Sequence, residues 1–161
     1  MVSRAQFLRG NFTGKRKHIR PPWTGSEQHL SDQCRRCTDC LKACPEQILC
    51  RDDQDFPTLD FRRGECTFCG ECAAVCTANV FQPITNRPWS LHAEITERCL
   101  PLQGVVCGRC AESCETTAIR MKLVAGGVGI PQLTQDNCTG CGACFNVCPA
   151  TAIRLTYQGE S

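Results

Sequence analysis

The sequence is short of the residues that usually build a large apolar core. Aromatic residues make up only 6% of its 161 residues, with one tyrosine and two tryptophans. No apolar run approaches the roughly 18 residues that a membrane-spanning helix needs, so we expect no membrane span. Basic and acidic residues nearly balance, at 18 against 16, and bulk charge therefore gives no indication of nucleic-acid binding. Something other than aromatic and aliphatic packing must stabilise much of the interior.

The N-terminal region lacks the features of an export signal. A secretory signal has an apolar stretch of roughly 7–15 residues after its basic start, whereas residues 10–25 are polar and basic. The segment 3–9 resembles the start of a twin-arginine signal, but it has only one of the two arginines and no apolar region follows. We therefore predict a cytoplasmic location, where thiols stay reduced and dense cysteines usually bind metal.

Cysteine is the residue that the sequence has in excess, at 17 positions. Three runs share the spacing C-x2-C-x2-C-x3-C, and a variant run keeps only the last three of these positions, because seven residues follow its first cysteine. Such self-similarity indicates an internal repeat of small structural units. The runs are Cys34, Cys37, Cys40 and Cys44; Cys66, Cys69, Cys72 and Cys76; the variant Cys99, Cys107, Cys110 and Cys114; and Cys138, Cys141, Cys144 and Cys148.

The segments between the runs repeat as well. Each run is followed by a turn and a short apolar stretch, such as residues 48–49, and extended segments at 57–61 and 131–134 lead into the next run. The loops at 51–55 and 125–129 contain the Asp and Gly residues that are typical of hairpins. The end of each run suits a helical turn. We therefore expect a small α+β fold of short hairpins and short helices.

The spacing of the cysteines favours iron–sulfur clusters over zinc and over disulfides. A C-x2-C-x2-C loop places three thiolates on one face, and glycines such as Gly70, Gly140 and Gly142 let the backbone pass close to a bound group. The fourth cysteine begins a helix and points away, so in two-cluster ferredoxins it ligates the other cluster. Structural zinc sites usually use well-separated C-x2-C pairs, and disulfides need an oxidising compartment.

Residues 30–157 resemble two bacterial-type ferredoxin modules in tandem, each holding two 4Fe–4S clusters. Pro45 and Pro149 complete the ferredoxin run in the first and fourth units, whereas Thr77 and Glu115 stand in that place in the second and third. The resemblance implies one module over residues 30–86 and a second over 92–157. The segment 83–92 is interpreted as the joint between them, and residues 1–29 as a basic N-terminal arm.

The same resemblance implies four interlocking ligand sets, with runs paired by chain order as a hypothesis. The alternative for the variant run is a three-iron or labile cluster. The odd cysteine, Cys50, is interpreted as a half-buried strand residue, with a redox role as the alternative. Site 1 takes Cys34, Cys37, Cys40 and Cys76; site 2 takes Cys66, Cys69, Cys72 and Cys44; site 3 takes Cys99, Cys107, Cys110 and Cys148; site 4 takes Cys138, Cys141, Cys144 and Cys114.

The N-terminal head is basic, with six basic residues against two acidic ones in positions 1–33. A solvated, disordered tail is the favoured interpretation, and a docking arm for a protein partner is the alternative. Nucleic acid is not an expected partner, because few phosphate-binding groups lie beyond this stretch.

The head and the runs together resemble one family of ferredoxin-type accessory proteins, which bacteria encode with their periplasmic nitrate reductase. The resemblance rests on the S-R-x-x-F-L-R start, the R-P-P-W at 20–23, the four runs and the stretched third run, although Ala5 stands where members often have a second arginine. It implies a cytoplasmic role in maturing the catalytic subunit of periplasmic nitrate reductase, by cluster assembly or by reduction, before export.

The alternative to maturation is electron transfer. A general electron carrier, passing single electrons between cytoplasmic or membrane partners, would use the same ligands. An enzyme is not expected, because His18, His29 and His92 lie in no recognisable catalytic motif.

Overall fold

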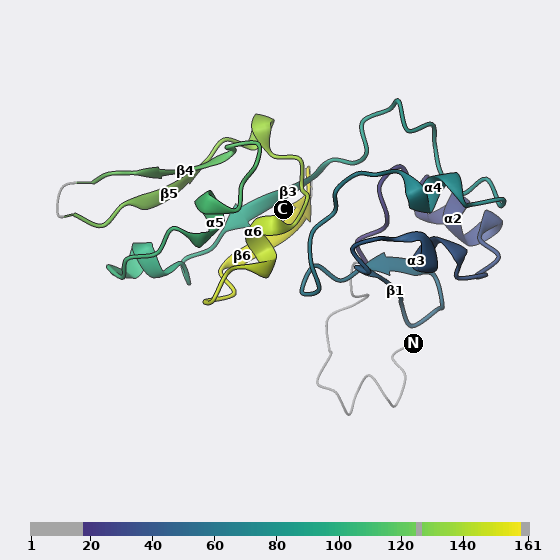
Figure 1. The fold of residues 1–161 in the computed structure, drawn as a ribbon, viewed down its shortest axis with the longest axis horizontal. Coiled ribbons are helices and arrows are strands. Elements are labelled where there is room, and N and C mark those ends of the chain that lie inside the picture. The colour runs from purple at the N-terminus through teal and green to yellow at the C-terminus, as the bar shows by residue number, and fades with distance from the viewer. Residues whose placement is uncertain (1–17, 125–126, 159–161) are drawn as a thin grey trace.

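The computed structural model describes residues 18–124 and 127–158. The S-R-x-x-F-L-R start and part of the hairpin loop expected at 125–129 therefore lie outside the described residues. The elements fall into two groups along the long axis of the molecule (Figure 1). The first group contains α2 (Glu27–Gln33), α3 (Asp39–Ala43), β1 (Leu49–Arg51), β2 (Pro57–Leu59) and α4 (Glu71–Ala74). The second contains β3 (Leu91–Ile95), η1 (Leu100–Gln103), α5 (Arg109–Glu112), β4 (Ile119–Lys122), β5 (Ile130–Leu133), η2 (Gln135–Asn137), α6 (Ala143–Asn146) and β6 (Ile153–Tyr157).

Short antiparallel strand pairs form the β part of the fold. The hairpins β1–β2 and β4–β5 arise where the sequence predicts them, with Cys50 opposite Thr58 and Arg120 opposite Gln132. The third pair, β3–β6, joins the two ends of the second group and was not predicted; it places Ala93 opposite Leu155. A small mixed α+β fold is therefore present, and its longest-range strand pairing closes the second group.

The helices are single turns or little more. The elements α3, α4, α5 and α6 each lie at the end of a cysteine run, as expected. The helix α2, which was not predicted, precedes the first run. Ser26 caps it by accepting a hydrogen bond from the His29 N–H, and Leu30 is its buried residue. Within the described ranges, no helix has the length and apolar character needed to cross a bilayer.

The apolar core is divided into three small clusters. One is built on Leu30, Phe56 and Val80, a second on Ala93, Ile119, Cys144 and Ile153, and a third on Ile48, Phe61 and Leu91. Cysteines of the runs pack against every cluster. The third cluster contains residues of both groups of elements, so the two halves share buried apolar surface.

The expected N-terminal arm needs correction from residue 18 onwards. Trp23 is buried, and its indole Nε1–H donates a hydrogen bond to the backbone carbonyl of Asn86 at 2.9 Å. Its backbone N–H donates to the carbonyl of Pro88 at 2.7 Å. Thr24 also forms an isolated β-bridge with Phe81. Trp23 is therefore anchored on its own chain, because apolar burial offsets the cost of ordering this segment.

A buried carboxylate attaches this segment to the β1–β2 loop. The Asp52 side chain is 1% exposed; its Oδ2 accepts a hydrogen bond from Arg20 at 2.7 Å, and its Oδ1 accepts from the backbone N–H groups of Gln54 and Phe56. Burial alone would raise the pKa of Asp52, but the hydrogen bonds from Arg20 and the two backbone groups outweigh it and lower that pKa. The charged form is therefore the one that stabilises the fold.

The substitution Asp52→Asn is expected to lower the free energy of unfolding by about 1–3 kcal/mol at neutral pH, because Arg20 loses the buried one of its two carboxylate partners and keeps only the exposed Glu27. A folded-state pKa below the unfolded value contributes stability above the unfolded pKa, so the difference between the two proteins should shrink below about pH 4. Anaerobic urea unfolding measures it. Asp53→Asn is the matched control, since that side chain is 77% exposed; an equal effect of both substitutions would contradict the prediction.

Candidate metal centres

The backbone of the cysteine runs repeats a left-handed conformation at fixed positions. The residue before the second cysteine has a positive φ in three runs, at Arg36 (55°), Phe68 (54°) and Gly140 (73°). This conformation is uncommon for residues with a Cβ, so its recurrence indicates that the loop geometry is imposed by the arrangement of the three cysteines. The variant run differs here, because Val106 does not share the positive φ.

Site 2 is a hollow of about 360 Å³, including its opening to solvent, and all four of its predicted cysteines line it. Cys44 reaches it from the first run, whereas the other three come from the second run. Burial, opposed by a hydrogen bond from the Phe68 backbone and assisted by the charge of Cys44, raises the pKa of Cys66 to about 12. The interlocking of the two runs that the ferredoxin resemblance implies is thus compatible with this geometry.

Site 3 is a second hollow, of about 350 Å³, and all four of its predicted cysteines line it: three come from the variant run and Cys148 comes from the fourth run. The first four of the seven residues after Cys99 form the 3-10 turn η1 (Leu100–Gln103), and Gly104 (φ 81°) ends that turn in the left-handed conformation. Burial, with smaller effects from the charges of Cys148 and Cys107, raises the pKa of Cys99. The stretched spacing therefore bulges outward and leaves the buried thiol of Cys99 beside the other three.

The thiols of sites 1 and 4 lie near one another in the same way. The pKa of Cys40 is raised to about 12, mainly by burial. The charges of nearby cysteines, which include the three other members of site 1, add to this rise. The pKa of Cys144 is also raised to about 12, mainly by burial, and the charges of nearby cysteines, which include the three other members of site 4, add to this rise. Each predicted set is thus brought together around a thiol that the protein partly encloses.

These four groups suit iron–sulfur clusters better than the alternatives. All 17 cysteines lie within the described residues and are free thiols. Enclosed thiols with raised pKa values cannot all ionise by themselves, whereas a bound cationic group stabilises the thiolate form. Backbone N–H groups also point at sulfur, from Ala152 to Cys148 Sγ at 3.2 Å and from Ala93 to Cys138 Sγ at 3.4 Å. Such hydrogen bonds are a known means of tuning cluster potentials, and spacing alone did not reveal them.

Two other groups of metal-ligating side chains are less suited to a metal. Cys50 stands apart from the sites and donates its thiol hydrogen to the Thr58 carbonyl at 3.6 Å, as expected for a half-buried strand residue. His18 lies 3.1 Å from Asp53 and 3.9 Å from Asp52. The Arg20 guanidinium already pairs with the Asp52 carboxylate, and its positive charge would repel a metal cation at this place.

Comparison with known proteins agrees with this chemistry. Residues 33–80 and 105–152 each match the 4Fe–4S dicluster domain family. The ferredoxin-type protein NapF of Escherichia coli is 41% identical over 140 residues, covering 87% of this chain and 85% of that protein. NapF of Haemophilus influenzae is 41% identical over 150 residues, with the same coverage. The methylamine utilization ferredoxin-type protein MauM of Methylophilus methylotrophus is 30% identical over 141 residues, covering 76% of this chain and 62% of that protein.

The chain is thus a ferredoxin-type iron–sulfur protein with two tandem dicluster domains, which hold up to four 4Fe–4S clusters. The resemblance drawn from the cysteine runs and the basic head is confirmed. Within that class, the chain belongs to the NapF family of ferredoxin-type proteins. The assignment of particular cysteines to particular clusters remains a prediction from the runs.

Proposed function

We propose that this protein assists the cytoplasmic maturation of the catalytic subunit of periplasmic nitrate reductase, by cluster assembly or by reduction, before that subunit is exported. It acts as an accessory iron–sulfur protein and not as an enzyme. Membership of the NapF family, shown over 87% of this chain, supports this role. The resemblance drawn from the sequence, to accessory proteins encoded with that reductase, supports it as well. Each predicted ligand set serves either mode of action.

The observation that carries the proposal is an exposed apolar loop beside site 3. Leu102 and Val105 are each 50% exposed and Val106 is 81% exposed, all within the insertion between Cys99 and Cys107. Apolar side chains gathered in one exposed loop are typical of a protein-contact surface. An accessory protein that presents a cluster to a client needs such a surface next to a cluster site.

The test is an anaerobic mixing experiment with the full-length chain. The protein is loaded with isotopically labelled iron, incubated with cluster-free catalytic subunit, and both proteins are re-isolated. Labelled cluster in the catalytic subunit, arriving faster than from free iron and sulfide, is the expected result for assembly. Complex formation without transfer, but with reduction of the client, would identify the reductive mode. Neither binding nor transfer would contradict the maturation role.

Substitution Val106→Glu should weaken the complex about ten-fold or more, since it introduces a charge into an apolar contact. Binding is measured by anaerobic titration of the catalytic subunit, and the iron content of the variant should equal that of the unmodified chain. Leu123→Glu is the matched control, because Leu123 is 84% exposed at the end of the β4–β5 hairpin. Equal weakening by both variants, or by neither, would remove this loop from the proposed interface.

A general electron carrier is the second candidate. It is favoured by the proximity of the two predicted sites within each half. The pKa of Cys40 of site 1 is raised by burial and, to a smaller extent, by the charge of Cys72 of site 2. The pKa of Cys144 of site 4 is likewise raised by burial and, to a smaller extent, by the charge of Cys110 of site 3. Reversible redox cycling that is indifferent to the maturation state of the reductase would favour this candidate.

A further inference from the structure

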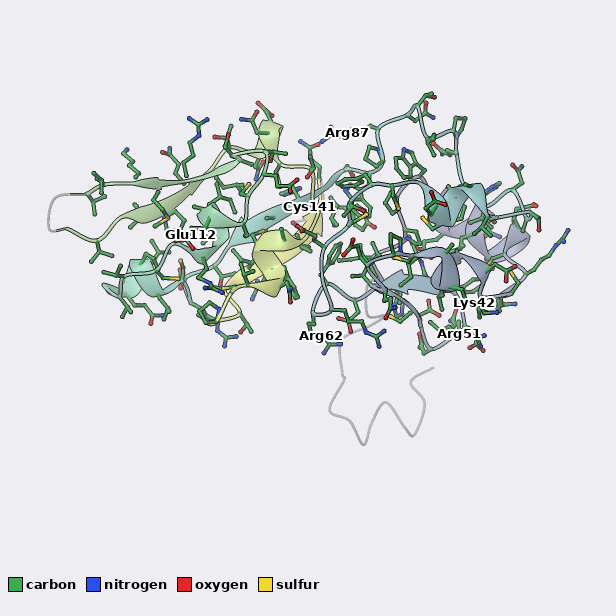
Figure 2. The ribbon with its side chains drawn as sticks, in the orientation of Figure 1. Lys42, Arg51, Arg62, Arg87, Glu112 and Cys141 are labelled. Atoms are coloured by element: carbon green, nitrogen blue, oxygen red, sulfur yellow. The ribbon has the colours of Figure 1, made fainter. Side chains whose placement is uncertain are left out.

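The two halves of the molecule meet at predicted cluster ligands. The backbone N–H of Cys66, assigned to site 2, donates a hydrogen bond to the carbonyl oxygen of Cys141, assigned to site 4, at 2.8 Å. Figure 2 shows Cys141 at the boundary between the two groups of elements. Nearby, the Trp89 indole N–H donates to the carbonyl of Thr139 at 2.7 Å. The contact between the halves therefore runs through the loops that surround sites 2 and 4.

A glycine in the fourth run makes this close approach possible. Gly142, directly after Cys141, has φ 89°, and a Cβ placed on it would overlap the ring of Phe61 from the first half. Phe61 is buried in the cluster that both halves share. A side chain at position 142 would therefore force the two halves apart.

The backbone conformation alone does not explain that glycine. The corresponding residue of the first run is Thr38, which keeps a side chain at φ 75°. The corresponding residue of the second run is Gly70, at φ 79°, where a Cβ would lie 3.8 Å from its nearest neighbour, the Ile84 side chain. Of these three positions, Gly142 is the one where a neighbour from the other half fills the space of the missing Cβ.

The contacts between sites give the four sites a linear order. Within the first half, α3, which contains Cys40 of site 1, packs against α4, which contains Cys72 of site 2. Within the second half, α5, which contains Cys110 of site 3, packs against α6, which contains Cys144 of site 4. The hydrogen bond from Cys66 to Cys141 joins the two inner sites. The order is therefore site 1, site 2, site 4, site 3, which differs from the order of the runs along the chain.

We propose that the contact formed by Phe61, Cys66, Cys141 and Gly142, here called the junction, couples the two halves electronically. Through it, a single electron supplied by an external one-electron donor passes between site 2 and site 4, so that one site is oxidised as the other is reduced and no proton or ligand moves. The two dicluster halves then act as one path with its ends at sites 1 and 3. This inference rests on the predicted ligand sets and is independent of the maturation role.

The physical basis of the proposal is the shortness of the connection. Electronic coupling through protein falls steeply with separation and is better through covalent and hydrogen bonds than across gaps. In Cys66 and in Cys141, a single methylene group separates the sulfur atom from the backbone, and one hydrogen bond joins the two backbones. Reduced clusters are paramagnetic, and their magnetic interaction also decreases steeply with distance, so the same contact can be tested by electron paramagnetic resonance.

The test uses the full-length chain with the substitution Cys37→Ala. Cys37 is exposed and is assigned to site 1 alone. Loss of that cluster should lower the iron content from about 16 to about 12 atoms per chain, and site 2 then has no partner within its own half. When the remaining clusters are fully reduced, the expected spectrum contains no signal from an isolated cluster, since site 2 still interacts with site 4. An uncoupled signal equal to one isolated cluster would overturn the proposal.

A matched pair of glycine variants locates the interaction at the junction. Adding Gly142→Ala to Cys37→Ala should restore the uncoupled signal of site 2, whereas adding Gly70→Ala, which imposes similar backbone strain without the Phe61 overlap, should not. An uncoupled signal in both double variants would overturn the role of the junction. If the Gly142→Ala variant fails to fold, the spectrum of the Cys37→Ala variant alone still decides whether sites 2 and 4 interact. Iron that stays near 16 in Cys37→Ala would overturn the ligand sets, and the proposal with them.

Discussion

Removing iron from the loaded protein is expected to unfold most of residues 30–157. The fully buried large side chains of the described residues are only Leu30, Ile48 and Leu91, and the apolar clusters are small. Cysteines of the runs pack against each apolar cluster, so the iron–sulfur clusters that they bind supply much of the interior. Small domains that close around a metal group gain their folding energy from binding it.

The measurement is far-ultraviolet circular dichroism during anaerobic chelation, with cluster absorbance followed in parallel. Both signals should decrease together, and both should return when iron and sulfide are supplied again. The control is addition of an iron-saturated chelator, which should leave both signals unchanged. An iron-free chain that keeps the circular dichroism of the loaded protein would contradict the expectation.

The fully loaded protein is expected to contain about 16 iron atoms per chain, four for each site. Cys99→Ser should reduce this to about 12, because Cys99 is buried at site 3 and lines its hollow with the three other predicted ligands. The other three clusters should keep their spectra, since their predicted cysteines are unchanged. Anaerobic iron and sulfide analysis, with visible absorption, measures the effect.

Cys50→Ser is the matched control for this experiment, because Cys50 is a partly buried cysteine outside the four predicted sites, with its thiol hydrogen-bonded to a backbone carbonyl. Its iron content should stay at about 16. A loss of iron in Cys50→Ser would show that Cys50 is a ligand. Iron near 12 in the unmodified chain, unaffected by Cys99→Ser, would favour the alternative of an empty or labile site 3.

The sequence could predict the local part of the sites because the relevant spacing is short. Three cysteines within seven residues can reach one bound group only through a tight loop, and the helical turn that follows each loop is equally local. The hairpins were predictable for the same reason, since the turn residues lie between paired strands. The helix α2 was missed because its signals, Ser26 as a cap and Leu30 as a lone buried residue, are weak in a polar segment.

Contacts between distant segments could not be predicted in this way. The pairing of β3 with β6 joins segments about sixty residues apart, as Ala93 opposite Leu155 shows. Trp23 lies in the expected N-terminal arm, yet it is buried and hydrogen-bonded to the segment that contains Asn86 and Pro88. In each case the outcome depends on which apolar surfaces meet after the chain has folded, and cysteine spacing contains no information about that.

By itself, the sequence determined the class of this protein: cysteine runs for up to four 4Fe–4S clusters in two tandem modules, with little else to build a core. The tertiary structure alone decided how the modules meet. Gly70 and Gly142 occupy the same place in their runs, but only at Gly142 does the packing of Phe61 leave no room for a side chain. The hydrogen bond between Cys66 and Cys141 likewise exists because the two halves share a buried surface, and long-range packing of this kind arises from the shapes of surfaces that lie far apart in the chain.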